Sequence, residues 1–256
     1  MRGRQHRADA GTSAADGTPA FVYAPELGDV GAELTLSDAE SHYVARVCRV
    51  GDGERVTASD GLGQIATLRV LSRAGAVRVL IESVERHPRT RRGWLLSGAP
   101  EGSRDDWEVE KLAELGVERF VPIECERGAW TGASRRHERW ERLAISAMKQ
   151  SRSAHRLEVA PPAPLGHVLE HLPPGATRAL ASERGEPVTG APPPAFWIGA
   201  VGPAAGLTAA EETTLTTAGF RAVRLGSRRL RTETAALALA ALLGLPEVSG
   251  APDRVS

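Results

Sequence analysis

Apolar and polar residues alternate through much of the first third of the chain, the pattern of strands that bury one face. Four segments show it, at residues 21–24, 55–58, 64–70 and 76–84. Gly and Asp at residues 51–53 and 60–63 punctuate these segments, and the two strands that flank the second group predict a hairpin. The pattern therefore predicts a small β-domain, for which we expect a barrel, over residues 20–88.

After a charged connection at residues 85–93 the spacing changes. Strand-like segments stand at residues 94–98, 118–125, 177–182, 195–201 and 220–225. Helical spacing appears at residues 105–116, 137–150, 208–219 and 232–244. Strands that alternate with helices predict an α/β domain with a mostly parallel sheet, here over residues 89–248.

Composition narrows the cellular setting. The chain has no run of eighteen apolar residues, so the sequence predicts no membrane span. Residues 1–19 lack the apolar core of a secretory leader and are expected to form a disordered tail, with a second tail at 249–256. Cys48 and Cys125 are the only cysteines, which favours a reducing cytoplasm.

The formal net charge is zero, although nucleic-acid binders usually carry a basic excess. A local basic patch can still exist within a neutral total. Arg86, Arg89, Arg91 and Arg92 in the connection are candidates for such a patch.

Two short motifs carry little weight. Residues 60–66 match a Gly-x-Gly-x-x-Ala dinucleotide pattern, but a strand follows where that fingerprint needs a helix, so a turn is favoured. His167 and His171 match an inverted zinc-protease pattern, but their segment is confined between Pro164 and Pro173 and a third ligand is not evident. We predict no metal site.

Two strand-to-helix connections are more informative. In the first, small residues at 199–206 follow an apolar strand and would let a ligand approach backbone amides closely, although a structural turn is the alternative. Thr208 and Glu211 then form a capping box for the next helix.

In the second connection, Arg228, Arg229 and Arg231 precede a helix that Thr232 can cap. Arginines are unfavourable at this positive helix end, whereas Glu233 suits it. Local helix stability therefore does not explain the arginines. An anionic partner would, whether nucleic acid, a carboxylate or a neighbouring subunit, and a solvated charge run is the alternative.

Four stretches together resemble one family. They are HYVARVCR at 42–49, with Gly51 and the turn at 60–61; KLAELGVERFVP at 111–122, with Cys-Glu-Arg at 125–127; WERLAISAMKQ at 140–150; and LGSRRLRTETA at 225–235. The last is the most specific, because many fixed residues coincide over eleven positions. From about Ala20 to Leu245 the chain resembles the bacterial ribosomal RNA small-subunit methyltransferase E family. That family belongs to the SPOUT superfamily and methylates uracil N3 in 16S rRNA.

The resemblance implies a PUA-like β-barrel followed by a SPOUT α/β domain with a C-terminal trefoil knot. It also implies a homodimer that binds S-adenosylmethionine and acts on 16S rRNA or the small ribosomal subunit. By similarity, the residues that bind the cofactor are Leu180, Ala181, Glu183, Gly202, Pro203, Gly206, Leu225, Gly226, Leu230, Arg231, Thr232 and Ala235.

Methyl transfer to N3 requires loss of the N3 proton. Arg231 is the candidate for stabilising the developing anion, and Glu233 or Glu183 is the candidate general base. The alternative is that these glutamates serve only to cap a helix or to orient a neighbouring group.

The chain departs from the family at one loop. Ala204 and Ala205 stand within Gly-Pro-Ala-Ala-Gly, where the family usually has Gly-Pro-Glu-Gly-Gly, and the register after Gln150 is also blurred. These departures leave two alternatives: a divergent SPOUT methyltransferase for a small molecule or peptide, or a non-catalytic RNA-binding homologue.

Overall fold

The alternating segments of the first third form a five-stranded sheet in the order β1-β3-β4-β5-β2. Its strands are β1 (Phe21–Tyr23), β2 (Glu33–Thr35), β3 (Arg55–Ser59), β4 (Gln64–Ser72) and β5 (Arg78–Arg86). β1 pairs with β3 in parallel, and the other neighbours are antiparallel. The computed structural model describes residues 19–130, 132–187 and 194–244, so nearly all of both predicted tails lies outside the described residues.

The predicted hairpin is confirmed between β3 and β4. One carboxylate oxygen of Asp60 accepts hydrogen bonds from the backbone amides of Leu62 at 2.7 Å and Gln64 at 2.9 Å. Gly61 and Gly63 adopt φ values of +75° and +112°, which glycine tolerates. Two helical elements, α1 (Asp38–His42) and the π-helical turn η1 (Tyr43–Val47), also belong to this lobe and were not predicted.

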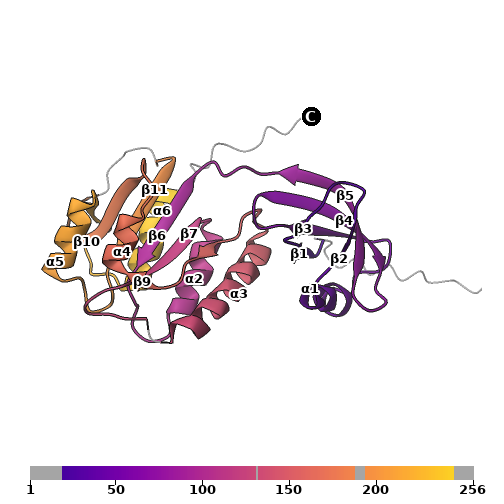
Figure 1. Ribbon diagram of the computed structural model, residues 1–256, viewed down its shortest axis with the longest axis horizontal. Coiled ribbons are helices and arrows are strands. Elements are labelled where there is room, and N and C mark those ends of the chain that lie inside the picture. Colours follow the sequence, from indigo (N-terminus) through magenta and orange to yellow (C-terminus); the bar gives the residue numbers. More distant parts are fainter. Residues whose placement is uncertain (1–18, 131, 188–193, 245–256) are drawn as a thin grey trace, which may run out of the picture.

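The sequence predicts a mostly parallel second sheet, and every strand pair in it is parallel, in the order β12-β10-β11-β6-β7-β8 with β9 beside β7. Its strands are β6 (Arg92–Ser97), β7 (Arg119–Glu124), β8 (Glu158–Val159), β9 (Ala163–Pro164), β10 (Thr177–Pro187), β11 (Phe196–Val201) and β12 (Arg221–Arg224). The helices are α2 (Asp105–Glu114), α3 (Ala133–Ser151), α4 (Leu165–Glu170), α5 (Ala209–Thr217) and α6 (Thr232–Gly244). Figure 1 shows the two lobes along the long axis of the molecule.

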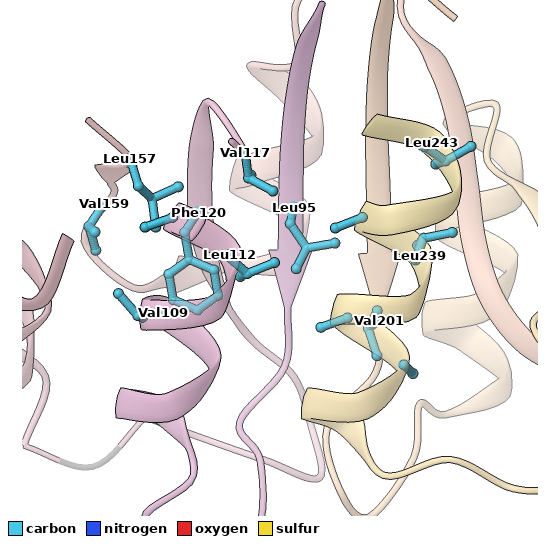
Figure 2. Close-up of a cluster of buried hydrophobic side chains, with 14 of the residues drawn as sticks. Leu95, Val109, Leu112, Val117, Phe120, Leu157, Val159, Val201, Leu239 and Leu243 are labelled. Atoms are coloured by element: carbon cyan, nitrogen blue, oxygen red, sulfur yellow. The ribbon is translucent and has the colours of Figure 1, made fainter. Parts of the chain in front are cut away.

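The main core of the α/β lobe lies between its sheet and helices α2, α3 and α6. Figure 2 shows Val109 and Leu112 of α2 near Leu95 of β6 and Phe120 of β7, and all four are fully buried. Each such side chain stabilises the fold by about 1.5–3 kcal/mol. The packing fixes the first turn of α2 and α6 relative to the strand ends.

Polar contacts join α3 to the first lobe. The Lys149 ammonium contacts both carboxylate oxygens of Glu40, at 2.7 and 2.8 Å, and lies 4.1 Å from the centre of the Tyr43 ring. The hairpin turn also makes backbone hydrogen bonds with the segment after α3, from Gly63 N to Ala154 O and from Arg156 N to Gly61 O, both 2.9 Å. The two lobes are therefore held together through main chain as well as side chains.

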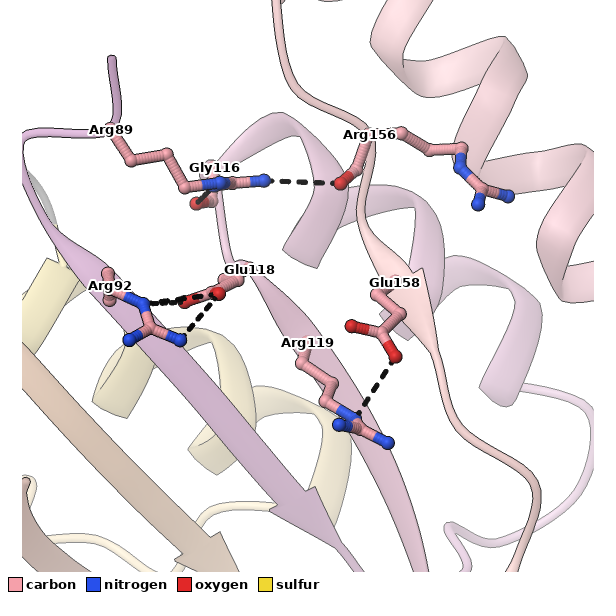
Figure 3. A network of polar contacts seen from close by, with 7 residues as sticks. All are labelled: Arg89, Arg92, Gly116, Glu118, Arg119, Arg156 and Glu158. Carbon is pink, nitrogen blue, oxygen red and sulfur yellow. Dashed lines mark hydrogen bonds and ion pairs between the residues drawn. The ribbon is translucent and has the colours of Figure 1, made fainter. Parts of the chain in front are cut away.

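The connection between the sheets is bound to the α/β lobe (Figure 3). Arg89 donates to the carbonyl oxygens of Gly116 at 3.3 Å and Arg156 at 3.2 Å, and burial lowers its pKa. Arg92 forms an ion pair with Glu118 at 3.0 Å. These two arginines, proposed above for a basic patch, thus have partners within the chain. The division at residues 88 and 89 stays a prediction.

The two weak motifs have structural roles. The His167 and His171 rings of the α4 segment stack with their centres 4.5 Å apart. Within the described residues, no group of three His, Cys, Asp or Glu side chains could hold a metal ion.

No helix among the described residues is long and apolar enough to span a membrane.

Candidate functional site

A cavity of about 970 Å³ opens at the carboxyl ends of β11 and β12, the edge where parallel sheets usually bind ligands, and beside residues 180–184 in the middle of β10. Three segments supply most of its lining, and all the site residues that the family resemblance implies are in it. They are Leu180, Ala181, Glu183, Gly202, Pro203, Gly206, Leu225, Gly226, Leu230, Arg231, Thr232, Glu233 and Ala235. Their individual roles stay predictions.

The first segment is a bulge in β10. Ala181 and Glu186 both pair with Val223 of β12, so the residues between them leave the ladder and turn towards the cavity. At Gly185, after the bulge, the backbone of β10 comes close to the backbone of β12. A Cβ there would lie 2.5 Å from the backbone nitrogen of Val223, so only glycine fits without a shift.

The second segment, loop 202–207, is held by main-chain hydrogen bonds. Ala204 N donates to Ala99 O at 3.1 Å, and Gly206 N donates to Pro203 O at 2.8 Å. Ala204 and Ala205 are exposed, and the cavity beside them stays open. The two methyl groups therefore do not fill the space that the departure from the family pattern put in question.

The third segment is loop 225–231 with the first turn of α6. The hydroxyl of Thr232 was expected to cap α6, but Thr232 lies inside the helix and donates to Gly202 O at 3.0 Å. Helix hydrogen bonding begins instead at Arg231, whose carbonyl oxygen accepts from Ala235 N at 2.8 Å. Thr232 thus joins the two strand-to-helix connections that the sequence singled out.

The candidate catalytic groups lie in different surroundings. Arg231 is exposed at the cavity wall. The Glu233 carboxylate is only 5% exposed and forms an ion pair with Arg104 at 3.4 Å. Glu183 is exposed and pairs with Arg229 at 3.4 Å across the cavity mouth. Sequence reasoning missed Arg104, which precedes α2 and gives no local signal of this contact.

A second buried acid stands near Glu233. Glu108 of α2 is fully buried, and among the described residues no hydrogen-bond partner reaches either carboxyl oxygen. Burial raises its pKa to about 8, with further contributions from the nearby charges of Glu233 and Asp105. Asp105 itself pairs with Arg136. Sequence reasoning missed Glu108, because two of the groups around it, Ser97 of β6 and Glu233 of α6, are distant in sequence.

Further lining residues were also missed, and most directly adjoin predicted ones. They are Glu101, Arg184, Leu207, Ala209, Glu212, Arg224 and Ser227. Val201, Ala204, Arg228 and Arg229 also line the cavity, and they belong to the two connections that the sequence singled out, while Ser182 lies between the predicted Ala181 and Glu183. The whole lining carries five arginines and four glutamates, so its formal charge is close to balanced, with a surplus of one positive charge.

Comparison with known proteins gives consistent matches along the chain. Residues 88–244 match the model of an RNA methyltransferase domain, and residues 36–81 match that of an RNA methyltransferase PUA domain. The chain is 32% identical over 236 residues to ribosomal RNA small subunit methyltransferase E from Synechocystis, covering 89% of this chain and 78% of the relative. The Mycobacterium bovis protein of the same name is 31% identical, covering 88% and 91%.

A solved structure agrees in fold as well. The crystal structure of ribosomal RNA small subunit methyltransferase E from Neisseria gonorrhoeae, bound to S-adenosyl methionine, superposes with a TM-score of 0.79. The two chains are 31% identical, and the match covers 88% of this chain and 96% of the other.

Proposed function

The chain belongs to the ribosomal RNA small-subunit methyltransferase E family of RNA methyltransferases, and we propose that it transfers a methyl group from S-adenosylmethionine to N3 of a uridine in 16S rRNA. The observation that carries the proposal is the single cavity that gathers every residue implied by the resemblance. The structure of a relative with S-adenosyl methionine bound supports the choice of cofactor.

The residues present fit this cofactor. The cavity volume of about 970 Å³ is at the upper end of the range for small-molecule sites, about 300–1,000 Å³. Loops 202–207 and 225–231 offer backbone groups and small residues, which suit adenine recognition by main chain, and Leu180, Leu225 and Leu230 offer apolar surface. Bound there, S-adenosylmethionine would supply an electrophilic methyl group on its sulfonium.

The chain's own contribution is positioning, charge stabilisation and proton acceptance. We assign Arg231 to the developing negative charge of the uracil, because its guanidinium is exposed at the cavity wall. Glu233 is our first candidate for the base that accepts the N3 proton, since Arg104 orients its carboxylate. Glu183 at the cavity mouth is the second candidate.

Three further properties are part of the proposal. The bond from Thr232 to Gly202 and the close approach of Gly185 to β12 support a knotted crossing of these segments. The other two are a homodimer that acts on the small ribosomal subunit and a cytoplasmic location, both of which the family resemblance implies.

The test is modification of 16S rRNA. Cells that lack the gene should lose N3-methyluridine from 16S rRNA by mass spectrometry of nucleosides, and the purified protein should restore it on isolated small subunits. Arg231→Ala should fail to restore it, whereas Arg221→Ala should succeed, because Arg221 is exposed on β12 away from the cavity. Unchanged methylation in the deletion strain would refute the proposal.

The alternatives have separate outcomes. A non-catalytic RNA-binding protein would bind small subunits without transferring a methyl group, and the open cavity argues against it. A small-molecule or peptide methyltransferase would consume S-adenosylmethionine in an extract freed of ribosomes. Only the rRNA methyltransferase requires the small subunit.

A further inference from the structure

The loop at residues 125–128 does not line the cavity, but it packs against Pro203 of loop 202–207. Cys125 and Gly128 close this loop with two reciprocal backbone hydrogen bonds of 3.0 and 3.1 Å. Neither residue lines the cavity, and sequence reasoning gave this loop no role beyond the family resemblance. Its position nevertheless determines where Pro203 can lie.

Pro203 is packed between two glycines. A Cβ on Gly128 would lie 2.6 Å from the Pro203 Cβ, and a Cβ on Gly98 would lie 2.4 Å from the Pro203 nitrogen. Both distances are shorter than side chains permit, so a larger residue at either position would displace loop 202–207. The cavity wall therefore depends on two glycines that no ligand would contact.

Glu211 fixes the same loop from the other side. The sequence pattern predicts that Glu211 is half of a local capping box, and Oε2 does accept from Thr208 N at 2.8 Å and from Thr208 Oγ1 at 3.1 Å. The other oxygen, Oε1, accepts from Glu126 N at 2.7 Å. One carboxylate thus joins the start of α5, which follows loop 202–207 directly, to the loop that carries Gly128.

Both oxygens of Glu211 are needed as acceptors. Burial alone would raise the pKa of Glu211, but the backbone bonds from Thr208 and Glu126 bring it below its ordinary value. A glutamine of the same size has one acceptor oxygen and an amide that only donates. It would therefore place an N–H donor against a backbone N–H at one of the two contacts.

We infer that Glu211 and Gly128 are positioning residues for the cofactor, which they serve by holding loop 202–207 in place without touching the cavity. The inference rests on the proposed function in one respect, because it takes this loop to be one wall of the S-adenosylmethionine site.

Calorimetric titration with S-adenosylmethionine tests the consequence for binding. Gly128→Ala and Glu211→Gln should each raise Kd at least tenfold. In methylation assays KM for the cofactor should rise while kcat at saturation changes little. Two controls separate this from general damage. Gly166→Ala adds a methyl group with nothing within 4 Å, and Thr214→Ala removes an exposed hydroxyl of α5 that donates to Ala210 O, outside the Glu211 contacts. Both should bind the cofactor as the unchanged protein does.

Amide hydrogen exchange of the free protein tests the positioning itself. The amides of Ala204 and Gly206 should exchange faster in Gly128→Ala and Glu211→Gln than in the controls, because their acceptors lie in or against the displaced loop. Unchanged exchange in both variants would overturn the inference, whatever the affinity. Failure of the unchanged protein to bind the cofactor would instead refute the proposed function, while the exchange rates still decide the positioning.

Discussion

Glu108 makes a sharp prediction about pH and stability. Its carboxyl group is fully buried, and its pKa rises from an ordinary value of 4.5 to about 8, chiefly through burial. The Ser97 hydroxyl lowers this pKa, but its own hydrogen bond goes to Gly98 O at 3.2 Å. The folded protein therefore keeps Glu108 neutral over a pH range in which the unfolded chain ionises it.

The difference in pKa between the folded and unfolded states sets the direction and the size of the change in stability with pH. An acid whose pKa is higher in the folded state favours folding fully only below its unfolded pKa. Stability should fall as the pH rises from 4.5 to about 8 and then level off. Each pH unit in this range is worth about 1.4 kcal/mol, so this one group lowers the free energy of unfolding by about 3 kcal/mol at pH 7 and about 5 kcal/mol above pH 8.

Urea unfolding at a series of pH values measures this. Glu108→Gln removes the titration while keeping the size of the side chain, so the variant should gain stability relative to the unchanged protein as the pH rises, by about 3 kcal/mol between pH 5.5 and 8.5. Glu114→Gln on the same helix is the control, because Glu114 pairs with Lys111 near the surface and should give a nearly constant difference. A difference for Glu108→Gln that does not grow with pH would refute the reasoning.

Three further predictions concern single contacts. Thr232→Val, which loses its hydrogen bond to loop 202–207, should weaken S-adenosylmethionine binding severalfold by calorimetry, and an unchanged Kd would contradict it. Lys149→Met leaves the buried Glu40 carboxylate without its cation and should lower the free energy of unfolding by about 3 kcal/mol in denaturant titrations. Burial raises the pKa of Cys125 to about 12, so iodoacetamide at pH 8 should modify the exposed Cys48 and leave Cys125 intact until urea is added, as mass spectrometry would show.

Local pattern predicted most of the fold. Long strands such as β4 and β5, and amphipathic segments such as α3, follow directly from alternation or helical spacing. The helical segment at 38–47 was missed, although Ser37 accepts a hydrogen bond from Glu40 N and is a readable helix start. The two-residue strands β8 and β9 exist only because β7 lies beside them, and no local pattern predicts such pairing.

The candidate site divides in the same way. Most lining residues of loops 202–207 and 225–231 were predicted, because both loops follow strands in sequence and the second matches a family signature. Thr232 was assigned to the right place but given the wrong partner, since its choice between helix cap and Gly202 depends on tertiary approach. Glu108 was not predicted for a similar reason. Its raised pKa depends on burial by other elements, which the local sequence does not indicate.

The main-chain hydrogen bonds between the β3–β4 turn and the segment after α3 have a consequence for how large an acceptor must be. These hydrogen bonds fix the distance between the first lobe and the cavity. An RNA that engages both lobes, as we propose for 16S rRNA within the small ribosomal subunit, has to present two features at that span already in place. A short oligonucleotide containing the same uridine satisfies only one end and should be methylated poorly even at high concentration.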